Sequence, residues 1–193
     1  LSVFKRHQVN DYIGLEGPWI SEDTLRIEKE KFKKIDFENP FSLGRKYDLA
    51  ISLEVAEHLK KSASETFIKS LTSLAPMILF SAAVPHQGGL HHINEQWLEY
   101  WGDLFDRNKF IPVDFLRDKI WHNDKVSFWY SQNTLLFVES KFYEENTAMF
   151  KNEQNLRNKP LSKIHPKLYL RYVKALKKSK NKTLKNRLKK LFK

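Results

Sequence analysis

The chain has 193 residues, of which 41% are hydrophobic and 13% aromatic, so it is long enough for one domain with a substantial core. It has no cysteine, which excludes disulfide bonds and thiolate metal sites and fits a reducing compartment, so we expect a soluble, cytoplasmic protein. The longest apolar stretch, residues 74–84, contains Pro76 and Ser81 and is too short to cross a bilayer, so no transmembrane segment is expected.

The net charge of +11 comes from one end of the chain. Residues 160–193 hold 13 Lys or Arg residues and no Asp or Glu, whereas residues 1–159 have a net charge of −2. A charge run of this kind is a property of a tail and not of the domain that precedes it. We therefore expect a globular domain over residues 1–140 and a helical, strongly basic extension over residues 141–193.

The first forty residues predict short elements separated by loops. Residues 1–8 read as the last turns of a helix whose start is missing. Residues 11–15 predict a strand, which the Glu16-Gly17-Pro18 sequence breaks sharply. Residues 22–31 are charged and fit either a short helix or a loop. Residues 33–37 predict a second short strand that ends around Asp36.

The most informative segment is residues 47–59. Its apolar run, residues 49–53, is too apolar for a strand with one wet face and predicts a strand over 47–53 that is buried on both sides in a parallel sheet. At the carboxyl end of this strand the sequence turns acidic, at Glu54 and then at Glu57, which His58 follows. In open α/β sheets ligands bind at that end of the strands.

Helices and strands alternate in the next part of the chain. Apolar residues at helical spacing predict amphipathic helices over 64–74 and 94–105, and Asn94 is a candidate N-cap for the second one. Strands are expected over 77–83, 111–116 and 128–138, and residues 85–90 form a loop. The chain beyond residue 138 is polar and helical, with basic amphipathic stretches around 168–176 and 184–192.

This order of elements predicts an α/β fold. Alternation of strands and helices implies right-handed crossovers and a mostly parallel sheet. The last two strands follow each other without a predicted helix between them, so we expect them to form an antiparallel pair.

The succession of segments resembles a class I S-adenosylmethionine-dependent methyltransferase of the small-molecule type, over roughly residues 1–140. The matching pieces are YIGLEG (12–17), IDF (35–37), YDLAISLEVAEHL (47–59), PMILFSAAVPHQGG (76–89), NEQWLEYW (94–101) and WYSQNTLLFV (129–138). Each piece is weakly specific, and their order and spacing carry the resemblance. It implies a three-layer, Rossmann-like methyltransferase sheet and S-adenosylmethionine as cofactor.

The resemblance also implies cofactor-binding residues. Glu16, next to Gly17, would bind the ribose hydroxyls, since a carboxylate accepts two hydroxyl hydrogen bonds. Asp36 would accept the adenine amine, with Phe37 near the ring. Leu53 and Glu54 would border the methionine part. The alternatives are a solvated acid at position 16, a loop acid followed by a core Phe at 36 and 37, and a helix-capping role for Glu54.

One departure from the family is large. The first strand and its Gly-x-Gly loop are missing, and in the family that strand lies between those that end here at Glu16 and Leu53. Its loss would open a gap of about 9.6 Å, two strand spacings, and expose two unpaired edges. We therefore expect an N-terminally incomplete methyltransferase that binds cofactor poorly. The rival arrangement is a sheet in which the two flanking strands pair directly.

Three histidines are candidates for a catalytic base: His58, His86 and His92. His58 follows the predicted buried strand, and the other two lie around the loop after the next strand, at the same expected edge of the sheet. Each also fits a histidine satisfied by local backbone. The adjacent pair His91-His92 does not predict a metal site, because neighbouring side chains usually point apart.

These features give an expected reaction, methyl transfer to an O, N or C nucleophile of a small molecule, such as a sugar or a lipid-linked metabolite. Two alternatives remain: an RNA-directed methyltransferase that uses the basic tail, and a non-catalytic fragment unable to hold cofactor. The tail itself fits a solvated helix packed on the domain, a contact with an anionic membrane surface, or phosphate contacts with nucleic acid.

Overall fold

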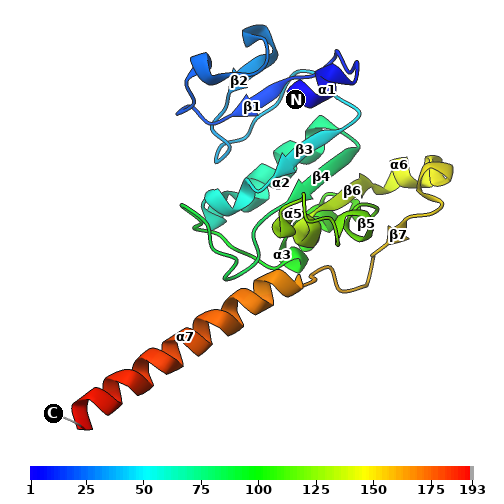
Figure 1. Cartoon of the computed structure of the whole chain (residues 1–193). Helices are drawn as coiled ribbons and strands as arrows, with labels where there is room; N and C mark the ends of the chain where they lie inside the picture. The colour runs from blue at the N-terminus through cyan, green and yellow to red at the C-terminus, as the bar shows by residue number, and fades with distance from the viewer. Residues whose placement is uncertain (192–193) are drawn as a thin grey trace.

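The computed structural model describes residues 1–191, with side chains placed as far as residue 180. The chain is an α/β protein in which a mixed five-stranded sheet and a separate two-stranded sheet are combined with helices (Figure 1). The second of the two expected basic stretches, 184–192, lies outside the residues whose side chains are described.

The two-stranded sheet is built by the N-terminal part of the chain. Helix α1 (Ser2–Arg6) precedes strand β1 (Gly14–Glu16), and two 3₁₀ turns, Glu22–Thr24 and Lys29–Lys31, lead into strand β2 (Phe32–Lys34). The two strands are parallel, with Leu15 opposite Lys33. Leu15 and Ile35 pack against the main hydrophobic core, which attaches this small sheet to the rest of the domain.

The five-stranded sheet follows in the order β3-β4-β6-β5-β7. Its strands are β3 (Ala50–Leu53), β4 (Met77–Ser81), β5 (Phe110–Asp114), β6 (Leu135–Glu139) and β7 (Gln154–Asn155). Strands β3 and β4 are parallel, whereas β4–β6, β5–β6 and β5–β7 are antiparallel. The expected antiparallel pairing of the last two predicted strands is present as β5–β6, but the sheet is mixed and the expectation of a mostly parallel one is not confirmed.

Helices connect these strands. Strand β3 leads through 3₁₀ turns at Ala56–His58 and Lys61–Ala63 into α2 (Ser64–Leu74), and α3 (Leu98–Arg107) precedes β5. The short helices α4 (Arg117–Ile120) and α5 (Phe128–Asn133) lie between β5 and β6. Helix α6 (Ser140–Glu145), a 3₁₀ turn at Thr147–Phe150 and the long α7 (Pro166–Leu191) complete the described chain.

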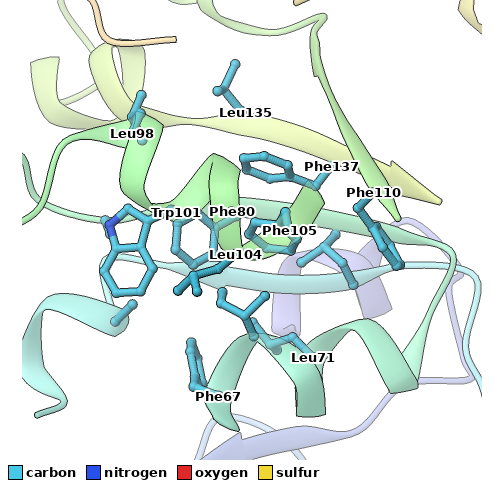
Figure 2. Close-up of a cluster of buried hydrophobic side chains, with 14 of the residues drawn as sticks. Phe67, Leu71, Phe80, Leu98, Trp101, Leu104, Phe105, Phe110, Leu135 and Phe137 are labelled. Atoms are coloured by element: carbon cyan, nitrogen blue, oxygen red, sulfur yellow. The ribbon is translucent and has the colours of Figure 1, made fainter. Parts of the chain in front are cut away.

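The main core lies between the five-stranded sheet and the helices α2 and α3 (Figure 2). Phe80 of β4 contacts Trp101 and Phe105 of α3, and the rings of Phe105 and Phe137 stack with centroids 3.8 Å apart. Burial of one such side chain contributes roughly 1.5–3 kcal/mol. On the opposite face a smaller cluster, with Phe150 and Val138 among its members, covers β5 and β6 and is contacted by Met77 and Leu79 of β4.

Several predicted boundaries are wrong for identifiable reasons. Residues 128–133 form helix α5 and not a strand, although the aromatic residues 128–130 favour a strand. Helix α3 begins at Leu98 with Trp97 at the N-cap position, and the side-chain oxygen of Asn94 accepts from Gln96 Nε2 at 3.0 Å. The extension expected to be helical over 141–193 includes strand β7 of the main sheet, and one continuous helix, α7, begins only at Pro166.

Strand β3 is an edge strand, which corrects the expectation that it is buried on both sides. It pairs with β4 on one side only, and Leu49 and Ile51 are 37% and 39% exposed. Strand β1 likewise pairs only with β2, so the direct pairing of these two strands is not present. The break between the two sheets therefore falls between the strands that end at Glu16 and Leu53, where the methyltransferase resemblance places a further strand.

The exposed edge of β3 gives a first testable prediction. An unpaired strand edge with apolar side chains promotes association with other chains, and a lysine at such an edge opposes it. Ile51→Lys is expected to reduce concentration-dependent light scattering while it changes the free energy of unfolding by less than about 1 kcal/mol. Leu90→Lys, at a loop position 82% exposed, is the matched control and is expected to leave the scattering unchanged; equal effects of both variants would contradict the prediction.

Helix α7 is anchored at its start and projects away from the body of the domain (Figure 1). Leu168 is buried, and the Arg171 guanidinium and the Tyr172 hydroxyl donate to the backbone carbonyls of Gln87 and His86. The basic helix is thereby tied to the loop that follows β4. Within residues 1–191, the structure contains no helix that combines the length and the apolarity needed to traverse a bilayer.

Candidate functional site

Polar and ionisable side chains gather where β3 and β4 end. The backbone N–H of Glu54 donates to the carbonyl and to the Oγ of Ser81, at 3.0 and 3.1 Å, which joins the ends of the two strands. Glu54 has a φ of +53°, a left-handed conformation that is uncommon for a residue other than glycine and is often found at functional sites. The turn after β3 then brings Glu57 and His58 to the same edge of the sheet.

An amide network holds the Glu54 carboxylate. Gln87 Nε2 donates to it at 2.9 Å and Asn133 Nδ2 at 3.2 Å, and Asn133 also donates to Gln87 Oε1 at 2.8 Å. Gln132 donates to Asn133 Oδ1 at 2.9 Å and accepts from the backbone N–H of His165 at 2.8 Å. Helix α5 buries its last three residues, and the side chain of Asn133, supported by Gln132, reaches the Glu54 carboxylate at the end of β3.

Glu57 is the most unusual group of the site. Its side chain is fully buried, and neither carboxylate oxygen has a hydrogen-bond partner among the described residues. Burial, followed by the nearby charge of Glu54, raises the pKa of Glu57 to about 8. Its backbone carbonyl accepts from the N–H groups of Ile93 and Asn94, at 2.9 and 3.0 Å, and so draws the segment around His92 against the turn after β3.

Two of the three predicted histidines come together here. His92 is half-buried, its Nδ1 lies 3.0 Å from Glu95 Oε1, and its Nε2 lies 4.0 Å from Glu57 Oε1. His58 is exposed and meets the His92 ring edge-on, with centroids 4.9 Å apart. His58 Nδ1 lies 3.3 Å from the backbone carbonyl of His91.

The third predicted histidine, His86, has a different position. Its side chain is exposed, and its hydrogen bonds are made by the backbone: the N–H donates to Glu95 Oε2 at 2.6 Å, and the carbonyl accepts from the Tyr172 hydroxyl. Glu95 also accepts from the N–H of Gly88, at 2.9 Å. Glu95 therefore organises the whole loop after β4 and orients His92, a role that the sequence pattern does not indicate.

The residues predicted to hold the nucleoside lie on the other sheet. Glu16 ends β1, and one of its carboxylate oxygens accepts from the N–H of Gly17 at 3.0 Å. Asp36 is exposed just beyond β2 and closes a local turn, where it accepts from the N–H of Glu38 at 3.0 Å. Because β1 and β2 are parallel, these two acids lie at the same edge of their sheet.

Two further predicted cofactor residues are apolar. Phe37 is buried in the main core, where its ring meets Phe41 and Phe67 edge-on at 5.5 and 5.7 Å. Leu53 is half-buried at the end of β3, directly before Glu54. No described hydrogen bond or ion pair joins the Glu16 and Asp36 pair to the cluster around Glu54, so the structure brings the predicted site residues together in two groups and not in one.

The cluster at the end of β3 concentrates negative charge. The charge comes from Glu54 and Glu95, because the raised pKa of the buried Glu57, about 8, keeps that carboxyl largely protonated at neutral pH. Among the described residues no Lys or Arg forms an ion pair with any of the three. A separate apolar hollow of about 250 Å³ lies on the face of the sheet that carries the smaller hydrophobic cluster, and it is lined in part by Met77, Leu79 and Leu136. Because that hollow lacks convergent polar groups, we place the candidate site at the cluster.

Comparison with known proteins adds no relative to these observations: no protein-family model, no curated protein and no solved structure matches this chain.

Proposed function

We propose that this chain is a methyltransferase domain that acts on a small molecule, with S-adenosylmethionine as the methyl donor. The observation that carries the proposal is the parallel pairing of β1 with β2, which sets Glu16 and Asp36 at one sheet edge. The break in pairing between β1 and β3 supports it, because the sequence resemblance implies a further strand between these two.

The residues present fit parts of the cofactor. Glu16 is half-exposed, and its described contact, the Gly17 N–H, involves one of its two oxygens, so the other can accept from ribose hydroxyls. Asp36 is exposed and offers acceptors for an amine. The negative cluster around Glu54 suits a cationic sulfonium and amine. Phe37 fits less well, since its ring is committed to the core.

When bound, S-adenosylmethionine supplies a methyl group that is already activated, so the protein has mainly to position the acceptor. Positioning of this kind contributes about 7–11 kcal/mol. His92 is the best-placed base: Glu95 accepts from its Nδ1 and so fixes the ring, which leaves Nε2 to take a proton from an acceptor hydroxyl or amine. His58 lines the open side of the same cluster.

Calorimetry with S-adenosylmethionine tests the nucleoside part of the proposal. The 193-residue chain is expected to bind it weakly, and Glu16→Ala and Asp36→Ala are each expected to weaken that binding at least tenfold. Asp48→Ala, an exposed acid just before β3, is the control and should leave binding unchanged. Equal affinities of the wild type, Glu16→Ala and Asp36→Ala would overturn the proposal.

The rate of methyl transfer tests whether His92 is the catalytic base. With an acceptor found by screening, His92→Ala is expected to lower kcat by roughly 10²–10⁴ and to leave cofactor affinity within twofold, because the base acts on the acceptor. His86→Ala, on the same loop but with an exposed side chain, should retain most of the activity. An equal loss in both variants would contradict the assignment of His92.

One observation favours RNA as an alternative acceptor. Arg171 and Tyr172, at the start of the basic helix α7, contact the carbonyls of Gln87 and His86, so a nucleic acid held by α7 would lie near the cluster. Binding through phosphates weakens steeply with salt, with a slope of about −0.7 per contact for single strands. A salt titration of labelled RNA binding therefore distinguishes RNA from a small-molecule acceptor. An RNA affinity that does not change with salt would exclude RNA as the acceptor.

A further inference from the structure

We propose that Glu57, His58 and His92 form a binding site for a divalent first-row transition-metal ion. Each of the three offers one ligand atom, and these atoms lie within 4.8 Å of one another. Two imidazoles and one carboxylate are a donor set typical of such ions, and in zinc enzymes three ligands of this kind leave a fourth position open. The inference goes beyond the proposed function and does not depend on it, because metal binding is measured without turnover. Nε2 of His92 cannot bind a metal ion and take a proton at the same time, so the two roles exclude each other in one chain.

The distances are close to those that a metal ion requires. Metal–ligand bonds of about 2.1 Å place tetrahedral ligand atoms about 3.4 Å apart. The ligand atoms therefore need to approach by up to about 1.4 Å, which rotation of the exposed His58 and the half-buried His92 can supply. Glu57 needs no movement toward solvent, because its carboxylate is already turned toward His92, with 4.0 Å between Oε1 and Nε2.

The state of Glu57 is a second and independent observation. A buried carboxylate without hydrogen bonds is costly, and proteins place such groups where a partner compensates for the lost solvation. Both oxygens of Glu57 lack a hydrogen-bond partner among the described residues, and the side chain is fully buried. A metal ion between Glu57 and the two imidazoles would supply that partner.

The outer contacts of both histidines favour the same arrangement. The Nδ1–H of His92 donates to Glu95 at 3.0 Å, and that of His58 donates to the carbonyl of His91 at 3.3 Å. In each ring this tautomer leaves Nε2 with a free lone pair. Metal-binding histidines usually have such a carboxylate or carbonyl on the other nitrogen, which fixes the ring and strengthens the ligand.

The metal alone is a sufficient probe. The full chain, treated with a chelator and dialysed, is titrated with Zn²⁺ in a calorimeter and with Co²⁺ in a spectrophotometer. One ion per chain is expected, at micromolar or tighter affinity, with visible Co²⁺ absorption that reports imidazole ligation. Mg²⁺, which prefers oxygen ligands and octahedral geometry, should bind at least 100-fold more weakly; equal binding of Mg²⁺ would overturn the assignment.

Four variants make the test specific. His92→Ala and His58→Ala are each expected to weaken Zn²⁺ binding at least 100-fold, and Glu95→Gln to weaken it 10–100-fold through the orientation of His92. His91→Asn is the matched control, because it removes a neighbouring imidazole outside the cluster and Asn tolerates the φ of +58° at that position. Circular dichroism establishes that each variant is folded. Equal Zn²⁺ affinity in the wild type and in His92→Ala would refute the site.

Discussion

Replacing Arg117 with alanine is expected to lower the free energy of unfolding by about 3–5 kcal/mol. The guanidinium is fully buried, and its Nε donates to Asp114 Oδ2 at 2.8 Å. Its Nη1 donates to the carbonyl of Leu161 at 2.6 Å. Removal of the cation leaves Asp114 as a buried carboxylate whose described remaining ionic partner is the partly exposed Lys163. Urea unfolding followed by circular dichroism measures the loss.

Two comparisons distinguish the effect of the buried ion pair on stability from that of an exposed ion pair. Lys119→Ala removes an ion pair with Glu153 in which the lysine side chain is 60% exposed, so it should cost less than about 1 kcal/mol. A double variant, Asp114→Leu with Arg117→Met, removes both charges and is expected to be more stable than Arg117→Ala alone. If Arg117→Ala costs no more than Lys119→Ala, the buried pair does not anchor the fold as we argue.

The same variant is expected to disturb the candidate site from a distance. The Leu161 carbonyl that Arg117 holds lies in the segment that leads to His165, whose N–H donates to Gln132. Gln132 in turn supports Asn133 and the carboxylate of Glu54. Loss of Arg117 should therefore accelerate amide exchange in this segment in addition to its effect on global stability.

The sequence predicts the elements whose signal is local. Helix α2 is predicted with its bounds, 64–74, because its apolar residues repeat at helical spacing and one side packs on the sheet. Strands β3 and β4 are predicted because their apolar runs are short, within the usual length of a strand, and are bounded by polar or turn-forming residues. Their carboxyl ends are also where the ionisable cluster lies, as the general rule for α/β sheets predicts.

The failures have a common cause, which is that long-range contacts override local preference. Residues 128–133 carry strand-forming aromatics, yet they form a helix that brings Gln132 and Asn133 to Glu54. The apolar run of β3 predicts burial on both faces, but burial depends on a neighbouring strand and a covering helix that no local pattern reports. Buried Arg117 could not be recognised, because Arg is usually exposed.

For the same reason, only part of the candidate site can be predicted from the sequence. Glu57 and His58 stand out because they follow a predicted buried strand. The link to His92 depends on the Glu57 carbonyl, which accepts two backbone N–H groups from a segment more than thirty residues away. The adjacent histidines 91 and 92 predict no metal site by themselves. In the structure His92 belongs to the cluster with Glu57 and His58, and His91 does not.

The metal-free protein is expected to lose several kcal/mol of stability between pH 5 and pH 8 through Glu57. Burial and the neighbouring Glu54 raise the pKa of this carboxyl from 4.5 to about 8 in the folded state. Below pH 4.5 both states are protonated and the group has no effect. Between these values the unfolded state ionises and the folded state does not, so stability falls as pH rises, by about 1.4 kcal/mol for each pH unit.

Glu57→Gln isolates this effect from the other titratable groups of the cluster, which are Glu54, Glu95, His58 and His92. The amide cannot ionise, so in the presence of a chelator the variant should match the wild type near pH 5 and exceed its stability at pH 8. Ser62→Ala, an exposed position on the turn before α2, is the control and should follow the wild type across the range. Because Zn²⁺ binds the ionised carboxylate, adding it should reverse the order at pH 8, with the wild type then the more stable protein. If the difference in stability between the wild type and Glu57→Gln stays constant from pH 5 to pH 8, Glu57 does not titrate in this range.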